Sequence, residues 1–378
     1  MKTLIMDCFG LSPFRTELLR SYFAGRGDEV LAVTSDWDHY KKQRRTSVPP
    51  GTVCLPALSY RRNISLRRAA SHYFFARDAF AYAEKVHADA VYTHVPPNSM
   101  AYFAALYKKR HPAARLYLSL IDMWPETMPG LAARNSFPFT LWRRLRDSAF
   151  PAADIIVCEC QLYIDRLRGV PGIEKAQRLY LAVQDPGFFS AGVPRSETLN
   201  LCYLGSINNI IDIQLIAQLT AALSRCRPVQ LHIIGDGENR QKLLDAARSA
   251  GADVHFYGLT FDAELKRRVF AQCHFALNVM KPQVCVGLTS KSLDYFAAGL
   301  PLLNTIAGDT AGWVNRFGAG FNITDTAETA ARVLALSPEA MGKMRAASRG
   351  IYDRYLSVPA YTARLHKIFD ADTKNPAR

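Results

Sequence analysis

The sequence predicts an α/β protein made of two doubly wound, Rossmann-like domains that face a common cleft. Short apolar strands alternate with helices along most of the chain, which is typical of parallel sheets covered by helices on both faces. A length of 378 residues allows two domains, each with its own core. Residues 185–196 are rich in glycine and proline and read as a linker. In such folds, ligands bind beyond the carboxyl ends of the strands.

The first domain is expected over residues 1–188. Its first strand starts close to the N-terminus and is followed by an aromatic helix that ends at Gly25. The same alternation then continues along the domain. The expected strands are 3–8, 29–34, 90–94, 115–121 and 155–158, and the expected helices are 14–25, 66–86 and 99–109.

The second domain is expected over residues 198–350, where the alternation is clearer. The predicted strands are 200–204, 230–234, 254–257, 275–279 and 301–304, and the helices are 212–223, 239–249, 262–270 and one around Lys291. A final segment, 351–378, contains a helix over 351–370. Its aromatic residues need a surface to cover, so we expect this helix to pack back towards the first domain.

Composition and cysteine usage narrow the class of protein. No stretch approaches the roughly 18–20 apolar residues of a membrane span, and the N-terminus does not read as a signal peptide. Eight cysteines are scattered along the chain, and the single residue between Cys158 and Cys160 is not a zinc-type spacing. We therefore expect a reduced, cytoplasmic protein without a metal cluster.

Positive charge is concentrated in the first domain, although the whole chain carries a net charge of +14. Basic residues precede an aromatic helix whose apolar residues recur at helical spacing. Such a helix can lie on an anionic membrane surface, or it can pack against its own domain while the arginines are solvated. No nucleic-acid motif is present, so nucleic acid is not an expected partner. The residues concerned are 41–45, Arg61, Arg62, Arg67 and Arg68, followed by Leu66, Ala69, Ala70, Tyr73 and Phe74.

Residues 289–301 read as a helix that begins at a hydroxyl cap, ends at a glycine and leads into a buried strand. Ser290 can cap this helix, Lys291 lies in its first turn, and Asp294 follows one turn later. A lysine at that position opposes the helix dipole, and a phosphate or diphosphate bound at the free N–H groups would remove the conflict. Without such a ligand, this is a surface helix with an arbitrary lysine.

Four motifs of the second half occur in the order and near the spacing of family 4-like glycosyltransferases with the GT-B fold. They are residues 203–207 (YLGSI), 231–237 (LHIIGDG), 256–258 (FYG) and 291–301 (KSLDYFAAGLP). Each motif is weak alone, but four in register are specific. The chain therefore resembles this family over nearly its whole length. The donor-site motif is closest to that of the glucuronosyltransferases of xanthan assembly, which are membrane-associated and inverting.

This resemblance implies a nucleotide-sugar site in the second domain. Gly205, Ser206 and Ile207 would bring backbone N–H groups close to a diphosphate. Lys291 would supply the balancing cation, with Ser290 beside it.

The remaining donor contacts are also implied by the resemblance. Asp294 takes the place of a glutamate that accepts hydrogen bonds from the ribose, and Thr260 and Met280 match positions near a uridine. The alternative for these two is that they are ordinary loop residues. The first glutamate of the family's Glu-x7-Glu pair falls at Val286, and residues 206–212 lack the usual arginine and lysine, which makes a retaining mechanism less secure. Uracil is favoured as the base, and guanine stays open.

An inverting transfer needs a general base on the acceptor side. Asp122 directly follows an apolar strand and matches the base of the xanthan enzyme, and burial beside a tryptophan would raise its pKa. A structural capping role is the alternative. Glu126 is a reserve that could orient the acceptor, and His94 is an alternative base or a structural histidine. Asp7 and Arg15 would border the acceptor site.

The resemblance thus implies transfer of a sugar from a nucleotide diphosphate donor to a lipid-linked saccharide at the cytoplasmic membrane face, in bacterial surface polysaccharide assembly. No metal or other cofactor is expected, because Lys291 and backbone N–H groups would hold the diphosphate. Two alternatives remain: a nucleotide-sugar 2-epimerase, which would act without an acceptor, and a non-catalytic binding or scaffolding protein, which would tolerate loss of Asp122.

Overall fold

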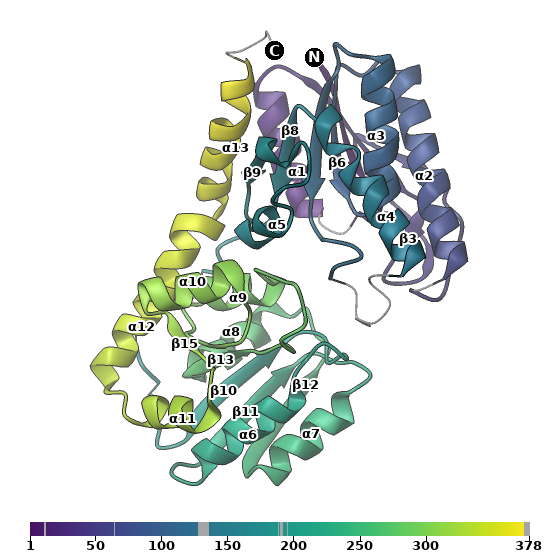
Figure 1. Cartoon of the computed structure of the whole chain (residues 1–378). Helices are drawn as coiled ribbons and strands as arrows, with labels where there is room; N and C mark the ends of the chain where they lie inside the picture. Colours follow the sequence, from purple (N-terminus) through teal and green to yellow (C-terminus); the bar gives the residue numbers. More distant parts are fainter. Residues whose placement is uncertain are drawn as a thin grey trace. The chain divides into compact units, whose positions relative to one another are not determined.

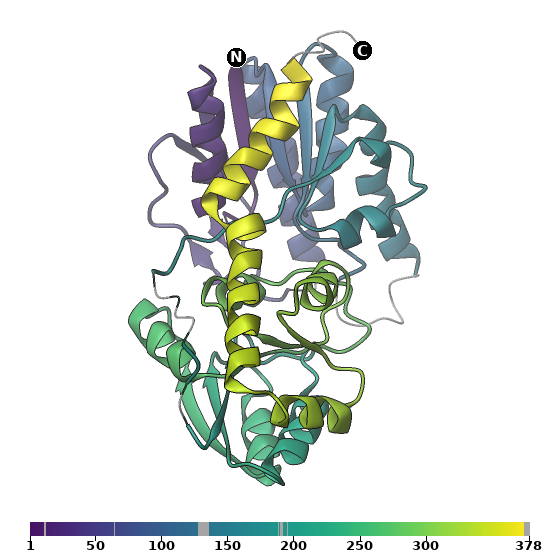
Figure 2. The ribbon, with the colours of Figure 1, turned by 90° about the vertical axis from the view of Figure 1, so that its left-hand side faces the viewer.

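The computed structural model describes residues 1–10, 13–63, 65–127, 136–187, 189, 192–194 and 196–373. The chain forms two compact units: unit 1 combines Met1–Leu181 with the residues from Thr362 on, and unit 2 is Ala182–Tyr361. Each unit contains one large parallel sheet with helices on both faces (Figures 1 and 2). The predicted α/β class, with two doubly wound units, is therefore confirmed.

Unit 1 has a seven-stranded sheet in the described residues, in the order β5-β2-β1-β6-β7-β8-β9. Helices α2, α3 and α4 lie on one face, and α1 lies on the other with the last part of α13 (Figure 1). All six residues of β6 are buried, because both faces of the central strands are covered. The strands are β1 (Lys2–Asp7), β2 (Glu29–Ser35), β5 (Thr52–Leu55), β6 (Ala90–Val95), β7 (Arg115–Leu120), β8 (Ile155–Cys158) and β9 (Ala176–Arg178), with a small hairpin of β3 (Trp37–Asp38) and β4 (Gln43–Arg44). The helices are α1 (Pro13–Gly25), α2 (Leu66–Lys85), α3 (Asn98–Arg110), α4 (Phe137–Asp147) and α5 (Gln161–Arg166).

Unit 2 has a six-stranded sheet in its described part, in the order β12-β11-β10-β13-β14-β15. Helices α6, α7 and α11 pack together on one face, over a core of leucine, isoleucine and valine side chains. The strands are β10 (Leu199–Leu204), β11 (Val229–Ile234), β12 (Ala252–Gly258), β13 (Phe275–Asn278), β14 (Leu302–Asn304) and β15 (Gly320–Asn322). The helices are α6 (Ile213–Ser224), α7 (Arg240–Ser249), α8 (Ala263–Gln272), α9 (Ser290–Ala297), α10 (Gly308–Phe317), α11 (Thr326–Leu334), α12 (Pro338–Ile351), a π-helical turn (Tyr352–Leu356) and the start of α13 (Val358–Thr373), which continues into unit 1.

The boundaries of the units differ from the predicted domain limits of 188, 198 and 351. Unit 2 already starts at Ala182, because the segment after it is bonded to the helices that close the unit. Val183 donates its N–H to the carbonyl of Leu356 at 3.0 Å and accepts a hydrogen bond from the hydroxyl of Tyr352 at 3.2 Å. Asp185 forms an ion pair with Arg349. The predicted linker therefore begins inside unit 2.

The end of helix α13 belongs to unit 1. The Phe369 ring lies 5.5 Å from that of Phe23 on α1 and 5.0 Å from that of Tyr117 on β7, measured between centroids. Asp370 accepts a 2.7 Å hydrogen bond from the hydroxyl of Tyr22. Phe369 thus completes the core on the α1 face of the first sheet.

Candidate functional site

In both sheets the chain reverses the direction in which it adds strands, and this switch lies between β1 and β6 in unit 1 and between β10 and β13 in unit 2. Open α/β sheets bind ligands beyond the carboxyl ends of their strands at this point. Of the predicted residues, Asp7 and His94 lie at the switch of unit 1. Gly205 and Met280 lie at the switch of unit 2.

Glycines bring two loops of unit 2 into close contact at this edge. Gly235 has a φ of +144°, and a Cβ atom there would overlap the carbonyl oxygen of Gly205; one on Gly237 would overlap that of Ile207. The Gly205 N–H donates to Ile234 and the Ile207 N–H to Asp236, both at 2.9 Å. The strand ends are therefore fixed by backbone bonds between the loops.

The structure corrects the prediction that Ile207 contacts the donor. Its side chain is fully buried in the core of unit 2. Its N–H is bonded to Asp236, and its carbonyl accepts the N–H of Asn239 at 3.0 Å. Ser206, in contrast, is exposed, and its carbonyl is fixed by a 2.8 Å hydrogen bond from the Tyr203 hydroxyl. Ser206 is thus the residue of this motif that stays accessible.

The N-cap of helix α9 lies one residue before the predicted cap, and the helix itself begins at Ser290. Thr289, not Ser290, is the N-cap, and its hydroxyl accepts a hydrogen bond from the N–H of Ser292 at 3.2 Å. Ser290 is the first helical residue and lies exposed at the helix N-terminus. The error arose because two successive hydroxyl residues fit the same capping pattern.

Lys291 is buried at the start of α9, with 8% of its surface exposed. Its Nζ atom lies 4.6 Å above the centre of the Tyr203 ring, and Gly205 adjoins its aliphatic chain. Burial lowers the pKa of Lys291 to about 7, while the aromatic face beneath it favours the charged form. Among the described residues, no carboxylate forms an ion pair with this ammonium. A buried cation with no protein anion is suited to binding an anionic ligand.

Asp294 lies one turn after Lys291, and it already has a partner in the protein. Lys266 of α8 approaches its Oδ1 atom at 3.0 Å, and both side chains are about a quarter exposed. This contact fixes the carboxylate while leaving it accessible. Lys266 was not predicted from the sequence, because nothing in the local pattern of α8 marks a residue that meets another helix.

The two residues predicted near the base have modest structural roles. Thr260 accepts the N–H of Asp262 at 3.1 Å and so shapes the turn before α8. The backbone of Met280 is held at both ends by the hydroxyl of Thr305, and its side chain packs partly against the core of unit 2. Both side chains are only partly buried.

In unit 1, Asp122 lies just after strand β7 and is held by two hydrogen bonds. Asp122 accepts hydrogen bonds from the Met123 N–H at 2.8 Å and from the Trp124 indole at 2.7 Å. Burial raises the pKa of Asp122, although these bonds oppose the rise. The predicted elevation of its pKa by burial beside Trp124 therefore has a physical basis. Asp122 does not cap a helix in the described residues.

Glu159 is a candidate residue that the sequence reading missed. It directly follows β8, and its N–H donates to Leu120 of the neighbouring strand at 3.2 Å. Its carboxylate forms a 2.5 Å ion pair with Arg15. Burial raises the pKa of Glu159, Arg15 opposes the rise, and the nearby charge of Asp122 adds to it. Its position directly after a buried strand, like that of Asp122, was a signal available in the sequence.

Three predicted residues hold this region in place. Asp7 accepts the N–H groups of Phe9 and Gly10 at 3.0 and 2.9 Å and so fixes the loop after β1. Glu126 pairs with Arg143 at 2.9 Å and with the fully buried Arg146, which anchors α4. The carboxylate of Glu126 is thus committed to these two arginines. His94 is almost fully buried, and burial lowers its pKa to about 4, so it is neutral at physiological pH.

The described residues contain no group of three or more His, Cys, Asp or Glu side chains arranged to hold a metal ion. None of their helices combines the length and apolar character needed to span a bilayer.

Comparison with known proteins links the fold to a class of enzyme. Residues 198–338 match the family "Glycosyl transferases group 1". No curated protein matches the sequence. Among solved structures, Anabaena Alr3699/HepE in complex with UDP has a TM-score of 0.71 at 14% identity, over 98% of this chain and 100% of that one.

Two further structures show the same fold over the whole chain. The apo form of the lipopolysaccharide outer core galactosyltransferase WaaB has a TM-score of 0.66 at 14% identity, covering 98% of this chain and 100% of that one. A structure described as trehalose-6-phosphate from E. coli bound with UDP-2-fluoro glucose has a TM-score of 0.68 at 10% identity, covering 99% of both chains. The protein therefore has the GT-B fold and is a glycosyltransferase with a group 1 domain in residues 198–338.

Proposed function

We propose that this protein transfers a sugar from a nucleotide diphosphate donor, with a UDP-sugar favoured, to a lipid-linked saccharide. The reaction would take place at the inner face of the cytoplasmic membrane, in the assembly of a bacterial surface polysaccharide. The observation that carries the donor part is Lys291, a buried ammonium with no carboxylate partner among the described residues, next to the Gly205 turn. A diphosphate at the N-terminus of α9 would supply the missing negative charge.

The preference for UDP rests on similar proteins. HepE has been crystallised with UDP and with UDP-glucose, and the E. coli structure holds UDP-2-fluoro glucose. The donor-site motif also resembles that of the xanthan glucuronosyltransferases. In this proposal Ser206 and Ser290 border the diphosphate, Asp294 accepts from the ribose, and Thr260 and Met280 lie towards the base.

The proposed reaction is an inverting displacement. The acceptor hydroxyl gives its proton to Asp122 while its oxygen attacks the anomeric carbon, and the bond from that carbon to the diphosphate oxygen breaks. The diphosphate leaves with its charge balanced by Lys291. A raised pKa suits Asp122 for this role, since a more basic carboxylate takes up a proton more readily. Arg15 and Glu159 lie on the acceptor side, and Asp7, His94 and Glu126 position the surrounding backbone and side chains.

A thermal-shift comparison tests the donor site. UDP should raise the melting temperature of the wild-type protein more than GDP or TDP does, because a ligand that binds only the folded state stabilises it. Lys291→Ala should lose this shift. Lys343→Ala is the matched control, since Lys343 is exposed on α12 and, among the described residues, pairs with the exposed Glu339.

The outcomes separate the alternatives. A UDP shift that survives in Lys291→Ala would contradict the assigned role of this lysine. No shift with any nucleoside diphosphate would refute the donor site itself and favour a scaffolding protein.

A further inference from the structure

We propose that unit 1 binds the acceptor through its lipid, with an apolar groove holding one isoprenoid-type chain and an adjoining basic pocket holding the phosphate or diphosphate at its head. This inference deepens the proposed function, because it rests on the acceptor being lipid-linked. It commits to a single lipid molecule as the occupant, not to the surface of a bilayer.

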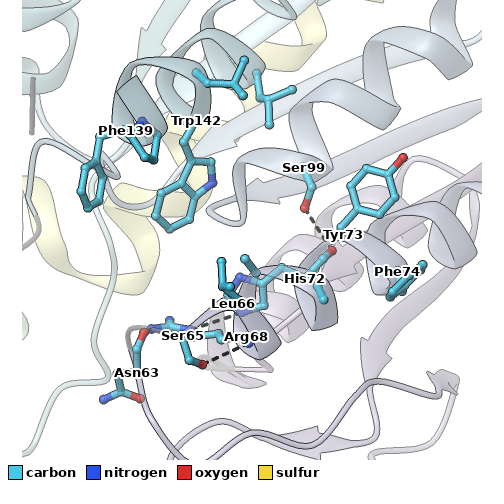
Figure 3. Close-up of a pocket in the computed structure, with 15 residues that line it drawn as sticks. Asn63, Ser65, Leu66, Arg68, His72, Tyr73, Phe74, Ser99, Phe139 and Trp142 are labelled. Carbon is cyan, nitrogen blue, oxygen red and sulfur yellow. Dashed lines mark hydrogen bonds between the residues drawn. The ribbon is translucent and has the colours of Figure 1, made fainter. Parts of the chain in front are cut away.

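The groove lies between α2 and α4 and has a volume of about 700 Å³, within the range of about 300–1,000 Å³ usual for small-molecule sites. Figure 3 shows Phe139 and Trp142 of α4 across the groove from Leu66 of α2. Ala69 and Ala70 also line it, and these small side chains leave space between the two helices. The surface exposed within the groove is mostly apolar.

The exposure of these side chains is unusual for a soluble domain. Leu66 is 90% exposed and Leu141, on α4, is 50% exposed, whereas Phe75 and Phe80 on the opposite side of α2 are buried in the core of unit 1. Tyr73 and Phe74 are also exposed, so the aromatic residues of α2 divide between two surfaces. Contiguous exposed apolar surface of this kind marks a binding site.

A basic pocket of about 570 Å³ adjoins the groove, and Ser65, the N-cap of α2, lines both. Four cationic side chains line this pocket, and its described lining includes no carboxylate. Neighbouring cations repel one another, so an anion bound among them would be stabilised. The four side chains are Lys42, Arg61, Arg62 and Arg67.

Arg68 lies in the wall of the groove near the basic pocket and supplies an independent sign of a ligand. It is only 6% exposed, yet its Nη2 atom has no hydrogen-bond partner among the described residues. A buried guanidinium nitrogen left unbonded costs free energy, and a phosphate oxygen could accept from it. Figure 3 shows Arg68 between Ser65 and His72, on the groove side of α2.

The same arginine connects this surface to the proposed base. Its guanidinium lies 4.5 Å from the centre of the Trp124 ring, and the Trp124 indole donates to Asp122. A lipid whose phosphate lies near Arg68 would therefore place the sugar attached to that phosphate towards Asp122. An apolar chain, an anionic head and a saccharide would meet three adjacent surfaces of unit 1 in that order.

Titration calorimetry with farnesyl diphosphate tests this proposal. The lipid is kept below its micelle concentration, and saturating UDP occupies the donor site. We expect farnesyl diphosphate to bind at least about tenfold more tightly than inorganic pyrophosphate, because only the former buries apolar surface. Ala69→Trp, which fills the groove, should lower the affinity for farnesyl diphosphate by at least about tenfold and leave the affinity for pyrophosphate unchanged. Ala81→Trp is the control, since Ala81 is exposed on α2 away from the groove.

A second variant tests the head site without disturbing buried residues. Arg61→Gln combined with Arg62→Gln should lower the affinity for farnesyl diphosphate and for pyrophosphate. The two arginines are exposed and line the basic pocket but not the groove. Equal affinity for farnesyl diphosphate in Ala69→Trp and Ala81→Trp would overturn the proposal. So would binding to anionic vesicles without binding to the monomeric lipid, which would make a bilayer the occupant. If UDP binds and farnesyl diphosphate does not, this inference fails alone; if UDP does not bind, the donor proposal fails instead.

Discussion

Lys291 combines burial, an aromatic contact and a helix N-terminus in one residue, and its protonation should control donor binding. With a pKa of about 7 in the free protein, the ammonium loses its proton as the pH rises through neutrality. A bound diphosphate favours the charged form, so binding should take up a proton.

We therefore expect UDP affinity to fall about tenfold per pH unit above the pKa of Lys291, and calorimetry in buffers of different ionisation enthalpy to show proton uptake near pH 8. Without ligand, the free energy of unfolding should rise with pH between about 7 and 10.5, because the unfolded chain then binds the proton that the folded chain has released. Pure proton release, or an affinity independent of pH, would contradict the assignment.

Asp122 provides the second test on a single residue. Asp122→Asn should lower kcat by about 10²–10⁴-fold, since proton transfer by a positioned base contributes that much, and should leave UDP affinity nearly unchanged. In the wild type, kcat/KM should rise with pH through a pKa above 3.8, since burial raises the pKa of this carboxyl. Asp165→Asn, at an exposed site on α5, is the control. An equal loss of donor binding in Asp122→Asn would show that this residue is structural.

Lys291 and Asp122 were both predicted from the sequence, for different reasons, but the contacts around them were predicted less well. Both follow or begin elements that are clear in the local pattern, so their positions at the sheet edges could be predicted. The partners could not. Lys266 meets Asp294, Arg15 meets Glu159, and Ile207 turns into the core, and each of these depends on how segments distant in sequence pack.

At the scale of elements, α2 shows what the basic and aromatic pattern of its sequence means. Arg61, Arg62 and Arg67 are exposed before or at its start, but Arg68 is buried and surrounded by aromatic rings. Arg68 is therefore neither solvated nor available to a membrane surface, which were the two alternatives expected for the arginines of this segment. The spacing of charges along a helix does not reveal which of them turns inward when the loop before it folds back.

Replacing Arg61, Arg62 and Arg67 with glutamine should reduce association with anionic vesicles, by about 1 kcal/mol of binding free energy for each charge near the surface. Co-sedimentation at several salt concentrations measures this. The control replaces Arg166, Arg225 and Arg248 with glutamine, which removes the same charge elsewhere; Arg248 is about half exposed on α7. Equal binding by the two triple variants would show that membrane contact does not involve this segment.

Most of the predicted elements were placed within about two residues of their bounds, but the final helix starts at Val358 and not at 351, and several elements, among them α4, α10, α11 and α12, escaped the sequence reading. The three-residue strands β9 and β15 are too short to show any periodicity. Helix α4 is held by the ion pair of its buried Arg146 with Glu126, a contact that spans 20 residues of sequence. Elements defined mainly by their tertiary partners carry little local signal.

At the scale of the whole molecule, the C-terminal helix is essential to unit 1. Phe369→Ala should lower the free energy of unfolding of unit 1 by about 3–5 kcal/mol, because it leaves a cavity among Tyr22, Phe23, Tyr92 and Tyr117. Urea denaturation followed by fluorescence measures this. Lys367→Ala, exposed on the same helix, should change stability by less than about 0.5 kcal/mol. A similar, small effect of both variants would mean that the helix end contributes little to the core.

This dependence of unit 1 on residue 369 has a consequence for how the protein is made. The residues of all seven strands of the first sheet have been translated when less than half of the chain has been synthesised. Domains usually fold in that order, as each emerges. Here, however, the part of the α1 face that Phe369 covers stays exposed until unit 2 has also been translated. Unit 1 therefore cannot complete its core until the last helix has been synthesised. Until then, the aromatic side chains that pack against Phe369 are exposed to water.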